Sequence, residues 1–424
     1  MVEILRIRRE RLGPDHPETL RCINNLALIY QFQGRYDPAE ELFLEVVDAQ
    51  TRVLGPEHQE TLLARNNLVT LRVLQGRFDD AEAICSEILE VQRERLGADH
   101  PDVLRSRMNL SVVYQNQGRL DDARTQLLEV LDRYRAILGD DHPETMMAAS
   151  NVAINYMFQG DLDESEARYR ELVERSTRVL GPDHPDTLIA VENLGNVRYR
   201  QGDLDGSEAL VRQVMEARNR VLGPEHPASL RTRGNLSVVL KNKGDLDAAQ
   251  VLAEEAVAIQ RTALGDDHFD VANALENLAA LRRAQGAFED AATYMREAVE
   301  IRRKVFGDDS SEVASSLMTL ATELYHGENW AEAQAVGQEA LRLRAEVLGE
   351  GDEATLGLRS FLATMALNLE QYAEAEALAL ECYEDAVRLG ETERASTQAK
   401  KLVTIYEKLG NESEAAVWRS RVQG

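Results

Sequence analysis

A short segment, LG followed by two residues and then HP, returns along this chain at a constant spacing. Copies of the segment begin at Leu12, Leu96 and Leu180, and its glycine recurs every 42 residues without insertion from Gly13 to Gly349. A strict period of 20–50 residues is typical of solenoids, in which each unit packs only on its neighbours. We therefore expect one repeated array, although 424 residues would otherwise suggest about three globular domains.

Two blocks of apolar residues at helical spacing fill each period. In the first period they are Ile23, Leu26, Ala27 and Tyr30, followed by Ala39, Phe43 and Val46. The pattern predicts helical hairpins, with first helices over about 17–33 and 59–75 and second helices over about 37–53 and 79–95. The tight turn inside each hairpin contains Gly34 or its equivalent, a residue that tolerates positive φ at a helix end.

Helix starts can be placed from capping signals. Asp37, Asp79 and Asp163 each have Glu three residues later, which is the capping-box spacing, so we expect the second helices to begin at these acids. The longer LGPDHP connector ends one helix at its glycine and opens the next near Pro17.

The expected fold is all-α, a right-handed superhelical solenoid of stacked helix-turn-helix hairpins with no β-sheet. Residues 1–13 would form a leading half-repeat, residues 14–306 seven regular hairpins, and residues 307–424 three divergent hairpins that include a C-terminal cap. A single hairpin cannot bury its apolar stripe alone, so we expect stacking to create one continuous core. Small residues such as Ala153 and Gly195 mark the expected close helix crossings.

The pattern Ile23-x-x-Leu26-Ala27-x-x-Tyr30, followed by Ala39-x-x-x-Phe43, resembles the tetratricopeptide repeat. The 42-residue length and the LG-x-[DE]-HP and NNLA elements look like the kinesin light chain-like subfamily, and the resemblance covers nearly the whole chain. It implies a superhelix whose first helices line a concave groove that receives peptides. The resemblance does not imply a motor, because the heptad segment of a true light chain is absent from this sequence.

One polar position of the first helix holds asparagine in seven successive periods, and we call it the asparagine ladder. Its members are Asn25, Asn67, Asn109, Asn151, Asn193, Asn235 and Asn277. An amide offers two donors and an acceptor, so it can pair with the backbone of an extended peptide. The resemblance assigns the same role to this position. The alternative is that each asparagine bonds a neighbouring helix and only sets repeat geometry.

Other residues on the same helices are candidates for ligand contacts. Arg105 and Arg231 supply positive charge and Tyr199 supplies an aromatic ring, with apolar residues such as Leu28 and Val112 between them. This mixture suits a peptide with apolar anchors and some acidic residues. A solvated helix face or core packing is the alternative interpretation.

Composition argues against several classes of partner and activity. The net charge of −26 disfavours nucleic acid and an anionic membrane surface, and the three widely spaced cysteines indicate a reducing, cytoplasmic setting without disulfides. Seven connector histidines recur too far apart to share one metal ion, so we expect them to act at helix starts. Phosphate loops, nucleophile elbows and zinc motifs are absent, so we expect no enzymatic activity and no cofactor.

The sequence thus predicts a scaffold or adaptor that binds protein or peptide partners. One alternative is the sensor segment of a larger signalling protein, such as a kinase or a nucleotide-dependent switch. Another is a solenoid that associates with itself. Residues 1–13 align with residues 43–55, so the chain opens on a second helix without its first helix. Either translation begins there or the chain is cut from something longer.

Overall fold

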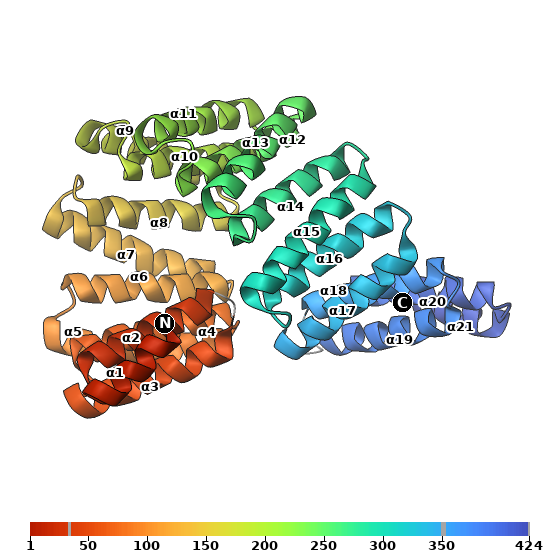
Figure 1. The fold of residues 1–424 in the computed structure, drawn as a ribbon, viewed down its shortest axis with the longest axis horizontal. Helices are drawn as coiled ribbons and strands as arrows, with labels where there is room; N and C mark the ends of the chain where they lie inside the picture. Colours follow the sequence, from red (N-terminus) through yellow and green to blue (C-terminus); the bar gives the residue numbers. More distant parts are fainter. Residues whose placement is uncertain (33–34, 349–352, 423–424) are drawn as a thin grey trace. The chain divides into compact units, whose positions relative to one another are not determined.

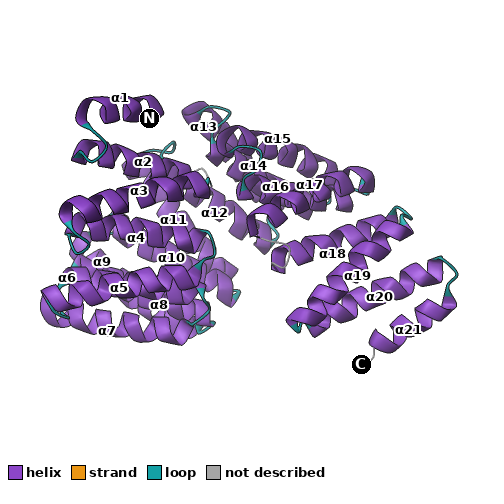
Figure 2. Ribbon diagram, turned by 90° about the horizontal axis from the view of Figure 1, so that it is seen from below, coloured by secondary structure: helices purple, strands orange, loops and turns teal. Residues whose placement is uncertain are grey.

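The computed structural model describes residues 1–32, 35–348 and 353–422, and these residues form α-helices joined by short turns, with no strand among them (Figures 1 and 2). The helices are α1 (Val2–Leu12), α2 (Pro17–Phe32), α3 (Tyr36–Leu54), α4 (Gln59–Leu74), α5 (Phe78–Leu96), α6 (Pro101–Asn116), α7 (Leu120–Leu138), α8 (Pro143–Gln159), α9 (Leu162–Leu180), α10 (Pro185–Gln201), α11 (Leu204–Leu222), α12 (Pro227–Lys243), α13 (Leu246–Leu264), α14 (Phe269–Ala284), α15 (Phe288–Phe306), α16 (Ser311–His326), α17 (Trp330–Leu348), α18 (Glu353–Asn368), α19 (Tyr372–Leu389), α20 (Thr392–Lys408) and α21 (Glu412–Val422). The all-α fold of stacked hairpins is confirmed.

The chain divides into two compact units, Met1–Lys243 and Gly244–Gly424. Within each unit, every helix packs mainly on the helices next to it in sequence (Figure 1). This division differs from the single continuous core that we expected from the sequence. Solenoid contacts are local, so nothing in a repeat ties distant parts of the array together.

The first helices from α2 to α14 each begin at a connector histidine, whereas α16 begins at Ser310. The Nδ1 atom of His100 accepts a hydrogen bond from the backbone N–H of Asp102 at 3.2 Å, and His184 does the same for Asp186. This is the N-cap arrangement, so the expected role of these histidines at helix starts is confirmed. At the other end, Gly97 closes α5 with φ 83°, a conformation that glycine adopts without strain.

The expected acidic caps of the second helices are wrong by two residues. Asp163 lies inside the first turn of α9, whereas the N-cap is Asp161, whose carboxylate accepts from the N–H of Glu164 at 3.3 Å. Asp37 likewise lies inside α3, whose N-cap is Arg35. Acids at these positions still complement the positive end of the helix dipole. The predicted turn glycine Gly34 and the connector glycine Gly349 lie outside the described residues.

The buried core consists of clusters that bridge one hairpin to the next. One cluster joins Leu104 and Met108 of α6, Leu131 and Tyr134 of α7, and Val152 of α8, and the Tyr134 side chain is almost completely buried. Small residues permit close helix crossings, as predicted. A Cβ atom on Gly195 of α10 would lie 3.3 Å from Val211 of α11, closer than most real contacts.

The second unit ends on a separate apolar cluster formed by α18 to α21. Trp418 of α21 is buried and its ring packs edge-on against Tyr383 of α19, with ring centres 4.9 Å apart. The last helix therefore covers the apolar side of α19 and α20. The predicted division of the chain at residues 13 and 306 stays a prediction.

Candidate peptide-binding surface

Four positions of each first helix point out from the same side, because residues spaced by four, three and four lie on one helical face. In α6 these residues are Arg105, Asn109, Val112 and Asn116, and all four are exposed or half-buried. We call this face, repeated over α2, α4, α6, α8, α10 and α12 of the first unit, the first-helix stripe. The six ladder asparagines of the first unit, from Asn25 to Asn235, run along its middle.

The stripe is much less acidic than the rest of the chain. Among its described residues in the first unit it carries four arginines, Arg21, Arg105, Arg200 and Arg231, and no carboxylate. The chain as a whole has a net charge of −26. Carboxylates therefore gather on other surfaces, and the stripe offers local positive charge to an acidic partner.

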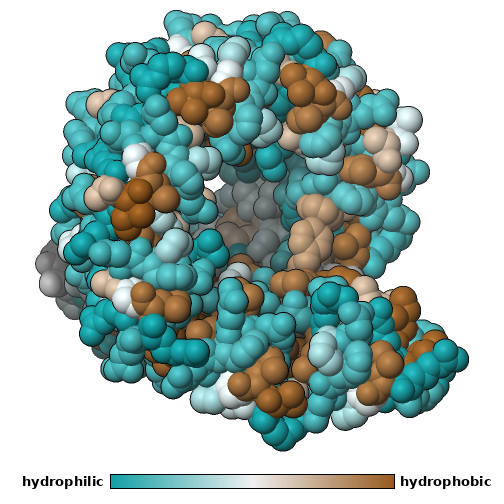
Figure 3. All heavy atoms as spheres, turned by 90° about the vertical axis from the view of Figure 1, so that its left-hand side faces the viewer, coloured by the Kyte–Doolittle hydropathy of each residue, from teal (hydrophilic) through white to brown (hydrophobic). Residues whose placement is uncertain are grey.

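Large apolar side chains interrupt the polar residues of the stripe. Leu63 of α4, Met147 of α8 and Ile189 of α10 are each about half exposed, at 54%, 44% and 46%. A cleft of about 360 Å³ lies beside Met147 and Ile189, with Ser176 of α9 also in its wall. On the face shown in Figure 3, hydrophobic side chains form separate patches within a hydrophilic surface.

The ladder asparagines reach back to the first helix of the preceding repeat. Asn67 donates through Nδ2 to Oδ1 of Asn24 at 2.8 Å, and Asn109 donates to Oδ1 of Asn66 at 3.3 Å. Asn235 donates to Glu192 at 3.0 Å. In every case the acceptor lies 43 residues earlier. These bonds support a role of the ladder in repeat geometry.

The same asparagines remain at the surface. Asn25 and Asn277 are exposed, and the five members between them are half-buried rather than enclosed. Asn151 makes a longer contact, 3.7 Å to the Met108 sulfur, and Asn193 lies beside the buried Tyr169 hydroxyl. An amide that uses one N–H for its neighbour still has a second N–H and a carbonyl oxygen. Ligand binding by the ladder stays a prediction.

Sequence reasoning missed the ion pair beneath the ladder. Arg218 of α11 contacts the Glu192 carboxylate of α10 at 2.9 Å, both side chains are almost buried, and Asn235 bonds the same carboxylate. Glu192 thus joins two repeats. Glu192 lies 43 residues before Asn235, which the sequence shows. That Glu192 pairs with Arg218 depends on the burial of both side chains, which the sequence pattern does not give.

The predicted aromatic residue Tyr199 is half-buried near the end of α10. Its hydroxyl accepts a hydrogen bond from Nδ2 of Asn242 at 2.8 Å, which again joins residues 43 apart. The predicted arginines are exposed, and Arg105 lies 3.6 Å from Asp102 of its own helix. Tyr199 therefore contributes to repeat stacking, while Arg105 and Arg231 remain accessible.

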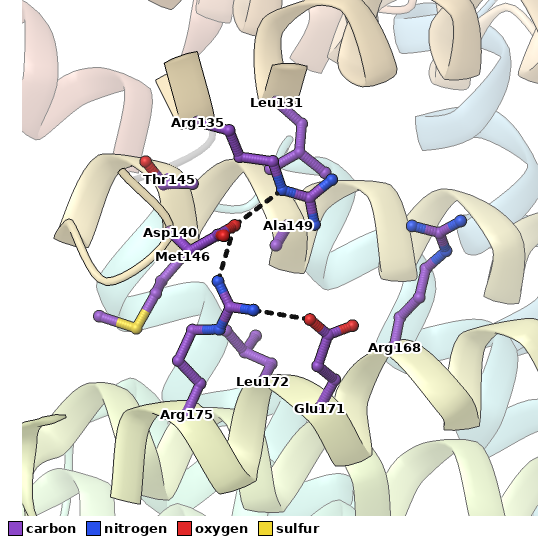
Figure 4. A pocket seen from close by; sticks show the side chains of 10 residues that line it. All are labelled: Leu131, Arg135, Asp140, Thr145, Met146, Ala149, Arg168, Glu171, Leu172 and Arg175. Atoms are coloured by element: carbon purple, nitrogen blue, oxygen red, sulfur yellow. Dashed lines mark hydrogen bonds and ion pairs between the residues drawn. The ribbon is translucent and has the colours of Figure 1, made fainter. Parts of the chain in front are cut away.

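A second hollow of the first unit, between α7, α8 and α9, is filled by its own charges (Figure 4). Asp140 accepts from Arg135 at 3.0 Å and pairs with Arg175 at 2.8 Å, and Arg175 also reaches Glu171 at 2.7 Å. These guanidinium groups hold the pKa of Asp140 below its usual value, Arg175 most strongly. The free space is only about 20 Å³, roughly one water molecule, so this network is structural.

Across residues 1–32, 35–348 and 353–422, no group of three or more His, Cys, Asp or Glu side chains is arranged to hold a metal ion. None of the helices in these ranges is long and apolar enough to cross a membrane.

Family models match most of the chain. The model of the MalT-like TPR region matches residues 135–417, and two tetratricopeptide repeat models match residues 60–136 and 108–157, and residues 19–60. These matches confirm the tetratricopeptide repeat expected from the sequence. No curated protein matches.

Solved structures resemble the chain over different lengths. A variant of the kinesin light chain TPR-like repeats of Podosopora anserina is 26% identical, covers 48% of this chain and 97% of its own, and has a TM-score of 0.44. BtubC from P. vanneervenii is 21% identical over 54% and 92% of the two chains, with a TM-score of 0.47. A signal transduction ATPase with a tetratricopeptide repeat sensor, from Pyrococcus horikoshii, is 14% identical over 85% and 55%, with a TM-score of 0.52. The last of these supports the fold alone.

Proposed function

Because this chain belongs to the tetratricopeptide repeat family, in which repeats serve protein interaction, we propose that its first unit binds an extended peptide of another protein along the first-helix stripe. The observation that carries the proposal is the charge of the stripe, which has four arginines and no carboxylate in a chain of net charge −26. The expected ligand has acidic residues and bulky apolar anchors.

Each part of the ligand has a matching part of the stripe. Apolar anchors would enter the cleft beside Met147 and Ile189, where exposed apolar surface is already gathered. Acidic residues would pair with Arg105 and Arg231, whose guanidinium groups suit carboxylates. The remaining N–H and carbonyl groups of the ladder would pair with peptide backbone, which gives affinity without reading sequence.

The ladder can be tested with one triple variant and one matched control. The variant changes Asn109, Asn151 and Asn193 to Ala, and the control changes Asn66 to Ala. The control removes the acceptor of Asn109 but leaves the Asn109 amide in place. A peptide selected by display on the wild-type chain is then titrated against each protein, and melting is measured on the same samples.

We expect the triple variant to lose more than tenfold in peptide affinity, since three lost hydrogen bonds at about 0.5–1.5 kcal/mol each exceed the 1.4 kcal/mol of a tenfold change. The control should melt slightly earlier and keep its affinity. Early melting of the triple variant with unchanged affinity would show that the ladder serves only repeat geometry. A selected peptide rich in basic residues would contradict the charge argument.

A second candidate function is that of a sensor segment of a larger signalling protein. The Pyrococcus horikoshii protein combines a tetratricopeptide repeat sensor with an ATPase, and the present chain spans 55% of its length. This role uses the same stripe, with the ligand acting as a signal. Sequencing upstream of the gene's first codon would distinguish a separate adaptor from such a segment.

A further inference from the structure

One position of the second helices carries a long side chain in most repeats. Its members in the first unit, each 42 residues from the next, are Arg8, Gln50, Gln92, Tyr134, Ser176 and Arg218. We call this set the spacer row. Ser176 of α9 is the one member of these six with a short side chain. The repeat that contains α9 therefore lacks a side chain that the neighbouring repeats have.

The long members of the spacer row reach the first helices beside them. In α7, the Tyr134 hydroxyl donates to the backbone carbonyl oxygen of Pro101 in α6 at 3.4 Å. In α11, Arg218 contacts the Glu192 carboxylate of α10 at 2.9 Å and also donates to the Thr232 hydroxyl of α12. Tyr134 and Arg218 are both buried. These side chains therefore fill the space where a second helix meets its neighbouring first helices.

Ser176 leaves the equivalent space of its own repeat open. Its hydroxyl donates to the backbone carbonyl oxygen of Val173 in the same helix, at 3.3 Å. The cleft of about 360 Å³ lies at this point, with residues of α8, α9 and α10 in its wall. Ala190 is buried within this lining, whereas Met147 and Ile189 are about half exposed and open to a ligand. The short side chain of Ser176 thus explains why the cleft lies in this repeat.

The charges around the cleft restrict how an acidic peptide can lie across it. Glu144 and Asp186 line the cleft from the first turns of α8 and α10, and these carboxylates repel an acidic residue placed beside them. The stripe arginines Arg105 and Arg231 lie in the hairpins on either side, in α6 and α12. An acidic peptide is therefore best accommodated with an apolar side chain in the cleft and its acidic residues toward α6 and α12.

We propose that Ser176 sets the register of the peptide ligand, because its short side chain lets one bulky apolar side chain of the peptide enter between α8 and α10. That anchor takes the place that Tyr134 fills in the preceding repeat. The ladder asparagine recurs in every repeat of the first unit, so it cannot define a register by itself. A volume of about 360 Å³ lies within the range of small-ligand pockets. This inference rests on the peptide binding proposed above.

The first test fills the cleft. Ser176→Tyr copies Tyr134, and the ring has room because Ala190 beside Ser176 matches Ala148 beside Tyr134. The matched control, Gln92→Tyr, places the same ring in the spacer row of α5, away from the cleft. A peptide selected by display on the wild-type full chain is titrated against each protein by fluorescence anisotropy, and melting is measured on the same samples. We expect Ser176→Tyr to bind at least tenfold more weakly without melting earlier, and Gln92→Tyr to keep the wild-type affinity.

The second test moves the gap by one repeat. The double variant Tyr134→Ser, Ser176→Tyr opens the spacer row between α6 and α8 and closes it between α8 and α10. The same peptide carries a photo-crosslinking group beside its apolar anchor, and mass spectrometry locates the residues that it labels. The wild-type chain should be labelled on α8 and α10, and the double variant on α6 and α8. The double variant should also bind the peptide more tightly than Ser176→Tyr alone.

The outcomes distinguish the role of Ser176 from peptide binding itself. Unchanged affinity of Ser176→Tyr, or labels that stay on α8 and α10 in the double variant, would overturn the role of Ser176 while peptide binding stands. An equal loss of affinity in Gln92→Tyr would overturn it as well, because the added ring would then act on the array rather than on the cleft. If the wild-type chain selects no peptide, the proposed function fails, and the role of Ser176 fails with it.

Discussion

Asn155 of α8 offers the sharpest test of how this array is stabilised. Its side chain is 0% exposed, and neither Oδ1 nor Nδ2 has a hydrogen-bond partner among the described residues. The equivalent residues of nearby first helices are Val113, Val197 and Val239, all buried. An unpaired buried polar group destabilises a fold by about 1–3 kcal/mol. We therefore expect Asn155→Val to stabilise the protein by about 1–3 kcal/mol.

The expected gain in unfolding free energy comes from the amide group, because Asn155→Val changes little else in the side chain. Asn and Val have similar helix propensities and similar sizes, so the substitution mainly removes the unpaired amide. For a unit of this size, about 1 kcal/mol corresponds to roughly 2–4 °C in melting temperature. The expected rise is therefore about 2–12 °C. The reverse substitution, Val197→Asn, should lower stability by a similar amount and serves as the matched control.

The assay is urea unfolding followed by circular dichroism at the helical band. A higher midpoint with an unchanged slope would show that the folded state gained stability, rather than that the unfolded state became more compact. If Asn155→Val left the midpoint unchanged or lowered it, the Asn155 amide would have partners in solution. An unpaired amide at Asn155 would then not be what limits stability.

Two further predictions concern other core positions. Lys401 of α20 has a pKa lowered by burial to about 8 and donates to Ser360 of α18. The unfolded chain keeps the Lys401 ammonium proton up to a higher pH than the folded chain does, so the free energy of unfolding should rise between about pH 8 and 10.5. Lys401→Met should remove this rise, which urea unfolding at several pH values across the range would measure. Ala153 of α8 is 0% exposed, so Ala153→Leu should overpack the crossing with α9 and destabilise the protein by about 1–3 kcal/mol. Hydrogen exchange should localise that loss to α6 through α11, and uniform loss along the array would contradict local coupling.

The features that the sequence could predict are those set by residues close together in the chain. The spacing of Ile23, Leu26 and Tyr30 gives a helical face whatever lies beside it, and the HP connector fixes a helix start because His100 caps a backbone N–H only two residues away. The period and the small residues at the crossings follow from the same local pattern. The misplaced caps show the limit of such patterns. Asp161 and Asp163 both have Glu three residues later, and the hairpin turn selected the first of them.

The features that only the tertiary structure decided depend on atoms from different repeats. The ladder bonds of Asn67 and Asn109 join residues 43 apart, and the bond from Gln75 to Glu40 joins residues 35 apart. Whether a polar group is paired or orphaned depends on what the next hairpin places against it. Asn155 and Glu323 occupy a position that is apolar in neighbouring repeats, and the sequence alone shows this difference. Only the structure shows that the Asn155 amide and one Glu323 carboxylate oxygen are buried without a hydrogen-bond partner among the described residues. A local pattern can place these residues on a helix, but hydrogen-bond partners are set by packing in three dimensions.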